Sequence, residues 1–388
     1  MGNAHVRMNE VREKEQNLQR VIYACQQDLK VCSLSKSPPD YAITQNKLGN
    51  AYRGMAEVRD WEQNLQKAIQ AYREALKVYS LTKFPTDYAT TQNNLGNIYR
   101  GIAEVKDGEQ NLQKAIQAYQ EVLKVYSLSD FPTDYAATQN NLGNAYGSMA
   151  EISDREQNLQ KAIQACMEAL KVYSLSDFPT DYAATQNNLG NAYGRMAEVT
   201  DREENLQRAI QTYQEALKVY SLSNFPKGYA ATQNNLGNAY GRMAEVADRE
   251  QNLQRAIQAY QEALKIRTLS ALPIGYAATQ NNLGNAYESM AEVRDREQNL
   301  QRAIQAYQNA LKVYSLSKFP ISYGGVNFNL GTVYLHWGEA ELRDAKKRAE
   351  ALEKAKAAFK ESVRVFQREN MEDWLSQAQD ALARLRKA

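Results

Sequence analysis

The sequence has only three cysteines and two histidines in 388 residues, so a disulfide framework is not expected. Neither sign of charge prevails, because 47 Lys and Arg residues face 45 Asp and Glu residues. This balance gives no electrostatic reason to expect a nucleic acid or an anionic membrane as partner. No apolar run approaches the ~20 residues that span a bilayer, and residues 1–16 lack the apolar core of a signal peptide. We therefore expect a cytoplasmic chain with neither nucleic acid nor membrane as partner.

The residue patterns of known catalytic and metal sites are missing too. His5 and His336 lie far apart in the chain, and no His/Cys cluster has the spacing of metal ligands. There is no Gly-rich phosphate loop, nucleophile elbow or pair of catalytic carboxylates. Cys25, Cys32 and Cys166 occupy positions that hold tyrosine in other parts of the chain, which indicates packing rather than a reactive thiol. The sequence thus predicts a protein that is not an enzyme and has no metal or cofactor.

One pattern dominates what is present: a Leu-Gly pair recurs every 47 residues. The pairs are Leu48-Gly49, Leu95-Gly96, Leu142-Gly143, Leu189-Gly190, Leu236-Gly237, Leu283-Gly284 and Leu330-Gly331. Most of the residues between the pairs repeat as well. A fixed period of this length is typical of a solenoid, in which each unit buries its apolar face only against its neighbours.

Each unit is predicted to be a pair of helices. In the copy that follows Pro132, apolar and small residues spaced by three and four predict a helix A over 135–152 and a helix B over 155–174. Asp154 and Gln157 resemble a capping box at the start of helix B. Gly143 lies inside helix A at a cost of ~1 kcal/mol in helix propensity. Its recurrence indicates that helix B approaches too closely for a side chain.

Helix A carries the motif Leu142-Gly143-x-x-Tyr146, and helix B, in another copy of the unit, carries Ala256-x-x-x-Tyr260-x-x-Ala263. Together the two motifs resemble the tetratricopeptide repeat. The standard unit has 34 residues, whereas this one has 47. The long unit looks like arrays found in large bacterial and archaeal signalling proteins. The resemblance implies an all-α fold, a right-handed α-solenoid of antiparallel helical hairpins, with the A helices on its concave surface.

The period divides the chain into four parts. Residues 1–36 read as a partial repeat, with half of a helix A and a helix B, and residues 37–320 as six full repeats. Residues 321–368 form a divergent seventh repeat, and residues 369–388 a capping helix that begins after Asn370.

The candidate binding residues form columns, in which equivalent positions of successive A helices carry the same residue type. The first column is Asn46, Asn93, Asn140, Asn187, Asn234 and Asn281. The second is Asn94, Asn141, Asn188, Asn235, Asn282 and Asn329. The third is Asn50, Asn97, Asn144, Asn191, Asn238 and Asn285. The first and third columns lie four residues apart and share a helical face.

Asparagine donates and accepts hydrogen bonds, so these columns could hold the backbone of an extended peptide. They could equally bond to one another and stiffen the array, and we favour this structural role for the second column. Four arginines beside them would suit a partner with scattered acidic groups, unless they are merely solvated: Arg53, Arg100, Arg195 and Arg242.

We therefore expect a scaffold that binds an extended peptide of a partner protein. The alternatives are a self-assembling spacer and the sensor arm of a larger signalling protein. Both alternatives would use a homodimer formed through the N-terminal end, where apolar residues have no preceding repeat to cover them. These residues are Val6, Met8, Val11, Val21 and Ile22.

Overall fold

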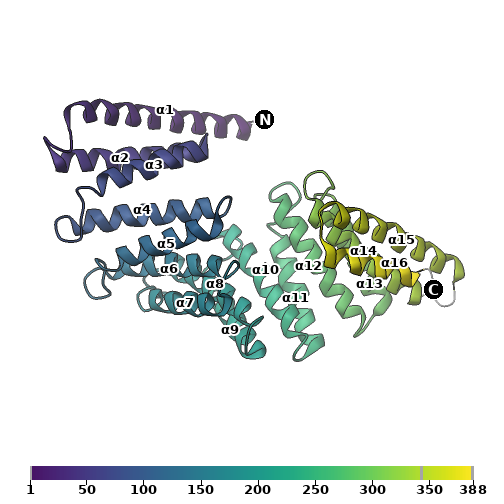
Figure 1. Ribbon diagram of the computed structural model, residues 1–388. Coiled ribbons are helices and arrows are strands. Elements are labelled where there is room, and N and C mark those ends of the chain that lie inside the picture. The colour runs from purple at the N-terminus through teal and green to yellow at the C-terminus, as the bar shows by residue number, and fades with distance from the viewer. Residues whose placement is uncertain (1, 341–343, 386–388) are drawn as a thin grey trace. The chain divides into compact units, whose positions relative to one another are not determined.

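The computed structural model describes residues 2–340 and 344–385, with side chains from residue 10 onward. All regular elements within these ranges are helices. The chain forms two compact units, residues 1–192 and 193–388, and each is described by itself. Figure 1 shows the helices of each unit lying in successive antiparallel layers. The expected all-α solenoid of helical hairpins is confirmed. Among the described residues, no helix is both long and apolar enough to cross a bilayer.

Hairpins of one A helix and one B helix make up most of both units. The A helices are α2 (Pro38–Ala56), α4 (Pro85–Ala103), α6 (Pro132–Met149), α8 (Pro179–Met196), α10 (Pro226–Met243), α12 (Pro273–Ala291) and α14 (Pro320–Ala340). The B helices are α3 (Trp61–Ala75), α5 (Gly108–Val122), α7 (Arg155–Ala169), α9 (Arg202–Ala216), α11 (Arg249–Leu264), α13 (Arg296–Leu311) and α15 (Ala345–Arg368). The first and last helices are α1 (Gly2–Val31) and α16 (Glu372–Leu385).

Both helices of the unit end earlier than the sequence pattern predicts. Helix α6 begins at Pro132 rather than near Tyr135, because proline suits the first helical position, where its missing N–H costs nothing. Helix α7 ends at Ala169, and the residues up to Tyr173 continue as hydrogen-bonded turns. Tyr173 packs on Ala136 and Ala169, which joins the end of α7 to the start of α6.

The turn from A to B depends on an aspartate in the left-handed region. Asp154 has φ 43° and makes no side-chain cap hydrogen bond, so the expected capping box with Gln157 is wrong. The left-handed backbone of Asp154 reverses the chain between α6 and α7, and its carboxylate accepts no hydrogen bond from the first turn of α7. Instead the buried Asn158 closes the turn, with its Nδ2 donating to the Ser153 carbonyl at 2.8 Å. Aspartate and asparagine are the residues, besides glycine, that enter this region most easily.

Helix α1 differs from the expectation of half a helix A followed by a helix B. It runs without interruption from Gly2 to Val31. The residue one period before Asp60 is Glu13, which lacks the short side chain that favours the left-handed turn. The helix therefore continues through the place where later hairpins reverse.

Each A helix packs closely on its B helix at the recurrent glycine. A β-carbon added at Gly49 would lie 2.6 Å from the ring of Tyr72, and one at Gly237 would lie 2.6 Å from the ring of Tyr260. At Gly143 it would lie 2.9 Å from Sγ of Cys166. The predicted close approach is confirmed, and both Cys166 and the tyrosines fill the space that glycine leaves.

The residues predicted for self-association fall into three groups. Val6 and Met8 lie outside the described side chains. Val11 and Val21 are 51% and 44% exposed on α1. Ile22 differs from the expectation, because it packs on the cluster of Cys25, Leu48 and Ala71 and belongs to the contact between α1 and the next hairpin.

At the other end, α14 and α15 form the divergent hairpin, and α16 packs on it through Ala378. Asp344 caps α15, with its carboxylate accepting from the backbone N–H groups of Lys346 and Lys347. Asn370 does not begin α16 as a cap. It has φ 55° and ends α15, while the next N–H, of Met371, donates to the carbonyl of Phe366.

Candidate functional site

The third asparagine column is tied to the B helix of its own hairpin. The hydroxyl of Tyr72 donates to Oδ1 of Asn50 at 2.7 Å, and that of Tyr260 donates to Oδ1 of Asn238 at 2.8 Å. The same bond joins Tyr119 to Asn97 at 2.8 Å and Tyr307 to Asn285 at 2.7 Å. The tyrosine is the residue that packs on the A-helix glycine, so one side chain fixes both the helix contact and the carboxamide.

The second column links neighbouring hairpins. Nδ2 of Asn282 donates to Oδ1 of Asn238 at 3.0 Å, and Nδ2 of Asn94 donates to Oδ1 of Asn50 at 3.4 Å. Asn188 reaches Oδ1 of Asn140, in the first column, at 3.0 Å. These bonds run from one A helix to the next within each unit, so the second column contributes to the stacking of hairpins.

The first column also contacts the next A helix, through a buried threonine. Nδ2 of Asn46 donates to the hydroxyl of Thr91 at 2.6 Å, and the hydroxyl of Thr279 donates to Oδ1 of Asn234 at 2.9 Å. Thr91 in turn donates to the carbonyl of Asp87 within its own helix at 2.7 Å. Asn234 is buried, whereas Asn46 is half-buried.

Two asparagines of the third column, Asn238 and Asn285, keep a donor available to a ligand, whereas Nδ2 of Asn50 donates to Oδ1 of Asn46 at 3.3 Å. Oδ1 of Asn238 accepts from both Tyr260 and Asn282, which fixes the amide so that Nδ2 points elsewhere. Oδ1 of Asn285 accepts from Tyr307 and Asn329 in the same way. Nδ2 of each has no hydrogen-bond partner among the described residues, and both side chains are exposed.

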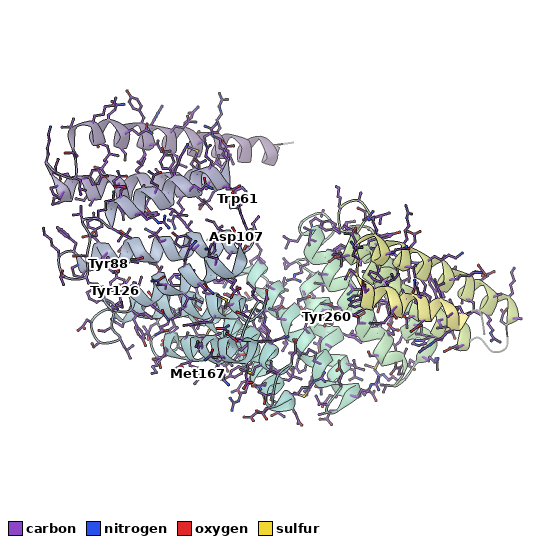
Figure 2. The ribbon with its side chains drawn as sticks, viewed as in Figure 1. Trp61, Tyr88, Asp107, Tyr126, Met167 and Tyr260 are labelled. Carbon is purple, nitrogen blue, oxygen red and sulfur yellow. The ribbon has the colours of Figure 1, made fainter. Side chains whose placement is uncertain are left out.

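A cavity of about 400 Å³ lies at these donors in the second unit. Its lining residues are Glu198, Asn238, Gly241, Arg242, Glu245, Leu253, Tyr260, Asn282, Asn285, Ala286 and Ser289. The asparagines and Arg242 come from α10 and α12, and Glu198 and Glu245 come from the turns after α8 and α10. Tyr260, labelled in Figure 2, contributes from α11. The structure thus brings together three predicted site residues, Asn238, Asn285 and Arg242, with Asn282 of the second column, for which a structural role was favoured.

The arginines that the sequence singled out already have partners to different degrees. Nη1 of Arg242 donates to the Gly194 carbonyl at 2.7 Å and lies 2.9 Å from the Glu198 carboxylate. Nη1 of Arg100 lies 4.0 Å from Glu104, and its Nε is buried without a hydrogen-bond partner. The positive charge of Arg242 is therefore largely balanced, so the cavity offers hydrogen-bond donors more than net charge.

Burial keeps the tyrosines that donate to the third column neutral. It raises the pKa of Tyr72 to about 12, and a smaller opposing effect comes from Arg53. Burial raises the pKa of Tyr260 and Tyr307 as well. A neutral phenol donates its single proton, so the tyrosine hydroxyl acts as the donor to the asparagine oxygen.

Two sets of residues in this framework were missed by the sequence interpretation. One is the tyrosine hydroxyl of most B helices. This tyrosine lies 22 residues after its asparagine, a spacing that does not appear as a helical period. The other is the buried asparagine that closes each A–B turn. Its constant place five residues after the accepting carbonyl was the available signal. This second set comprises Asn64, Asn111, Asn158, Asn205, Asn252 and Asn299.

Comparison with known proteins agrees with these hairpins. The sequence profile of the tetratricopeptide repeat matches residues 89–132, 183–225 and 230–267. This chain contains tetratricopeptide repeats in these three segments. The matched segments contain the A and B helices of three hairpins, and the same residues recur at the same period outside them. Proteins of this family are typically non-catalytic scaffolds that bind other proteins.

Solved structures match this chain at low sequence identity and with TM-scores below 0.5. The MamA protein is 22% identical, with 57% of this chain and 96% of that chain covered and a TM-score of 0.36. The C-terminal part of a repeat protein from Cytophaga hutchinsonii is 15% identical, with 85% and 99% covered and a TM-score of 0.49. The Rap protein complexed with Competence and Sporulation Factor is 12% identical, with 98% of each chain covered and a TM-score of 0.43. No curated protein matches this chain in sequence.

Proposed function

We propose that this repeat protein is a non-catalytic scaffold that holds an extended peptide segment of a partner protein on its asparagine-lined A helices. The observation that carries the proposal is the cavity of about 400 Å³ beside Asn238, Asn282 and Asn285. Nδ2 of Asn238 and Asn285 would donate to peptide carbonyls, while Oδ1 of Asn282 would accept from a peptide N–H. These contacts are to the peptide backbone, so they require an extended conformation but do not depend on particular side chains.

The internal hydrogen bonds strengthen this proposal. Tyr260 and Asn282 hold Oδ1 of Asn238, so the orientation of the carboxamide is fixed before a ligand arrives. A donor that is already fixed loses less conformational entropy on binding than a freely rotating one. The stiffening role and the binding role of the column are therefore compatible, because they use different atoms of the same amide.

The test begins with selection of random 12-residue phage-displayed peptides against the whole chain, followed by calorimetry of a selected peptide. The informative variant is Asn238→Asp/Asn285→Asp, which keeps the oxygen that Tyr260 requires and removes the free donor. We expect at least a tenfold weaker affinity with unchanged helical content. The exposed Gln251→Glu controls for added charge. Equal binding by the double variant, or no selected peptide at all, would contradict the proposal.

Self-assembly is the second candidate function, and one observation favours it. Helix α1 carries apolar side chains that are largely exposed, including Val11, Val21, Tyr23 and Val31 at 51%, 44%, 64% and 77%. A second copy of the chain that covered them would remove this area from water. In this case the chain would form a homodimer and act as an assembly unit, with or without peptide capture.

A further inference from the structure

A second cavity, of about 520 Å³, lies in the first unit on the side of the B helices. Its lining residues are Trp61, Glu62, Gln66, Ile69, Gln70, Arg73 and Glu74 of α3, Tyr99 and Ile102 of α4, and Lys106, Asp107, Gln110, Asn111 and Lys114 of the following turn and α5. Figure 2 labels Trp61 and Asp107, which both line it. The lining set includes no residue of the asparagine columns, so this cavity is separate from the surface proposed above.

Residues that depart from the repeat pattern meet at this cavity. Trp61 stands where the next five hairpins have Gly108, Arg155, Arg202, Arg249 and Arg296. Arg73 stands where most helices have Gln26, Gln120, Gln214, Gln261 and Gln308. Ile102 stands where other A helices have Met55, Met149, Met196, Met243 and Met290. The three positions belong to two neighbouring helices, α3 and α4, and their side chains line one hollow.

The charge of Arg73 exceeds what the fold needs at its position. Nη2 of Arg73 donates to the hydroxyl of Tyr99 at 2.9 Å. In the next hairpin, Gln120 makes the equivalent bond to the hydroxyl of Tyr146 at 3.2 Å without any charge. A neutral glutamine therefore satisfies the structural requirement, and the guanidinium adds a positive charge and further N–H donors at the cavity.

A second cation stands over the same tyrosine. Nζ of Lys114 lies 5.7 Å from the centre of the Tyr99 ring. Neither Lys114 nor Arg73 forms an ion pair with any described carboxylate. Two of the three carboxylates that line the cavity have partners of their own, and the third, Asp107, forms no ion pair with a described residue. Glu62 lies 3.1 Å from Lys106, and Glu74 lies 2.6 Å from Lys77, outside the cavity.

Three apolar residues also line the cavity. Trp61 is 37% exposed, and Ile69 and Ile102 belong to the lining with it. A ligand that placed a carboxylate between Arg73 and Lys114 could therefore place an apolar side chain against Trp61. Guanidinium groups pair with carboxylates through two parallel hydrogen bonds, and tryptophan offers a large rigid contact area.

We propose that this cavity binds an acidic peptide segment of a partner protein, in which Glu or Asp stands beside an aromatic or large aliphatic residue. The carboxylate lies between Arg73 and Lys114, and the apolar side chain packs on Trp61 and Ile69. Specificity at this site comes from side chains, whereas the asparagine columns would contact only backbone. The two sites can therefore be tested independently.

The indole N–H of Trp61 gives a direct measurement. The chain has three tryptophans, so its three indole signals in a proton–nitrogen correlation spectrum are resolved, and Trp61→Phe identifies one of them. The probe is the capped tripeptide acetyl-Glu-Phe-Glu-amide, and its uncharged match is acetyl-Gln-Phe-Gln-amide. We expect the acidic peptide to shift the Trp61 signal with at least tenfold higher affinity than the neutral one, and to leave Trp337 and Trp374 unchanged.

The matched variant is Arg73→Gln, which introduces the residue found in the equivalent position of α5 and so preserves the fold. It should weaken the acidic peptide about tenfold and leave the neutral peptide unaffected. Gln261→Arg, which adds an arginine beside Tyr287 without a nearby tryptophan equivalent to Trp61, should create no new binding. The proposal is overturned if Trp61 does not respond, if Arg73→Gln binds equally well, or if 3-phenylpropionate binds as tightly as the peptide.

Discussion

The hydroxyl of Tyr260 donates to Oδ1 of Asn238 at 2.8 Å, and the ring of the same tyrosine fills the space opposite Gly237. One residue of helix B therefore determines both how closely helix A approaches and which way its asparagine points. The same bond joins Tyr72 to Asn50, Tyr119 to Asn97 and Tyr307 to Asn285. The stability of the hairpin and the orientation of the candidate binding surface are thus coupled.

Removing this hydroxyl should destabilise the second unit modestly. We expect Tyr260→Phe to lower the free energy of unfolding by about 0.5–1.5 kcal/mol, since a buried hydrogen bond is lost while the ring still packs. A double-mutant cycle with Asn238→Ala, measured by urea unfolding, should give a coupling energy of similar size. Asn144→Ala is the matched control, because Cys166 replaces the tyrosine of its hairpin. A cost for Asn144→Ala equal to that for Asn238→Ala would contradict the coupling.

Two glycines of α6 should respond oppositely to alanine. At Gly143 a β-carbon would lie 2.9 Å from Sγ of Cys166 and 3.3 Å from the Ala162 carbonyl oxygen. At Gly147 it would meet nothing within 4 Å. We expect Gly143→Ala to destabilise by about 1–3 kcal/mol through overpacking, and Gly147→Ala to stabilise by up to ~1 kcal/mol through helix propensity. Thermal unfolding followed by circular dichroism measures both effects on stability. If both changes had the same sign, contact with helix B would not determine how an alanine affects stability at these positions.

The sequence predicts the hairpins well because their period and apolar spacing are local properties of the chain. Leu142, Gly143 and Tyr146 share one face of α6, and this is enough to place both the helix and its close contact. The turn was predicted less well, because aspartate favours both a helix cap and the left-handed region. Only the backbone shows that Asp154 adopts the second.

The candidate site was predictable as a set of columns but not as a set of available atoms. Asn238 and Asn282 lie in different columns, and nothing in their spacing indicates that one amide donates to the other. Side-chain hydrogen bonds between hairpins depend on the distance and rotation of neighbouring helices, which one sequence does not specify. The cavity beside Trp61 was missed for another reason: its residues differ from the repeat pattern and belong to three helices and a turn.

Self-association through α1 predicts a dimer that charge can dissociate. We expect Val11→Glu/Val21→Glu to raise the dissociation constant at least tenfold, since carboxylates would be buried at an apolar contact. Light scattering coupled to size exclusion, over a range of concentrations, measures the mass. Val246→Glu is the control, because Val246 is 44% exposed, as Val21 is, but lies in the other unit. A wild-type chain that is monomeric at every concentration would exclude this assembly.

The last hairpins should depend on pH through one histidine. Nδ1 of His336 on α14 lies 3.5 Å from Oε1 of Glu288 on α12, and Oε2 of the same carboxylate lies 3.0 Å from the hydroxyl of Tyr307. The hydrogen bond to Glu288 raises the pKa of His336, and partial burial opposes it. Glu339 raises this pKa further, while Arg296 lowers it.

Because the folded pKa of His336 lies above its unfolded value of about 6.5, the charged imidazole favours the folded state. This contribution is complete below the unfolded pKa and is lost as pH rises through the folded one. Urea unfolding of the wild type and of His336→Asn should therefore differ most near pH 5.5, and the difference should shrink toward pH 8.5. Glu288→Gln should flatten the profile in the same way, because it removes the carboxylate that raises the pKa. A wild-type advantage that stays constant or grows as pH rises would mean that the His336–Glu288 contact stabilises these hairpins without depending on the imidazolium charge.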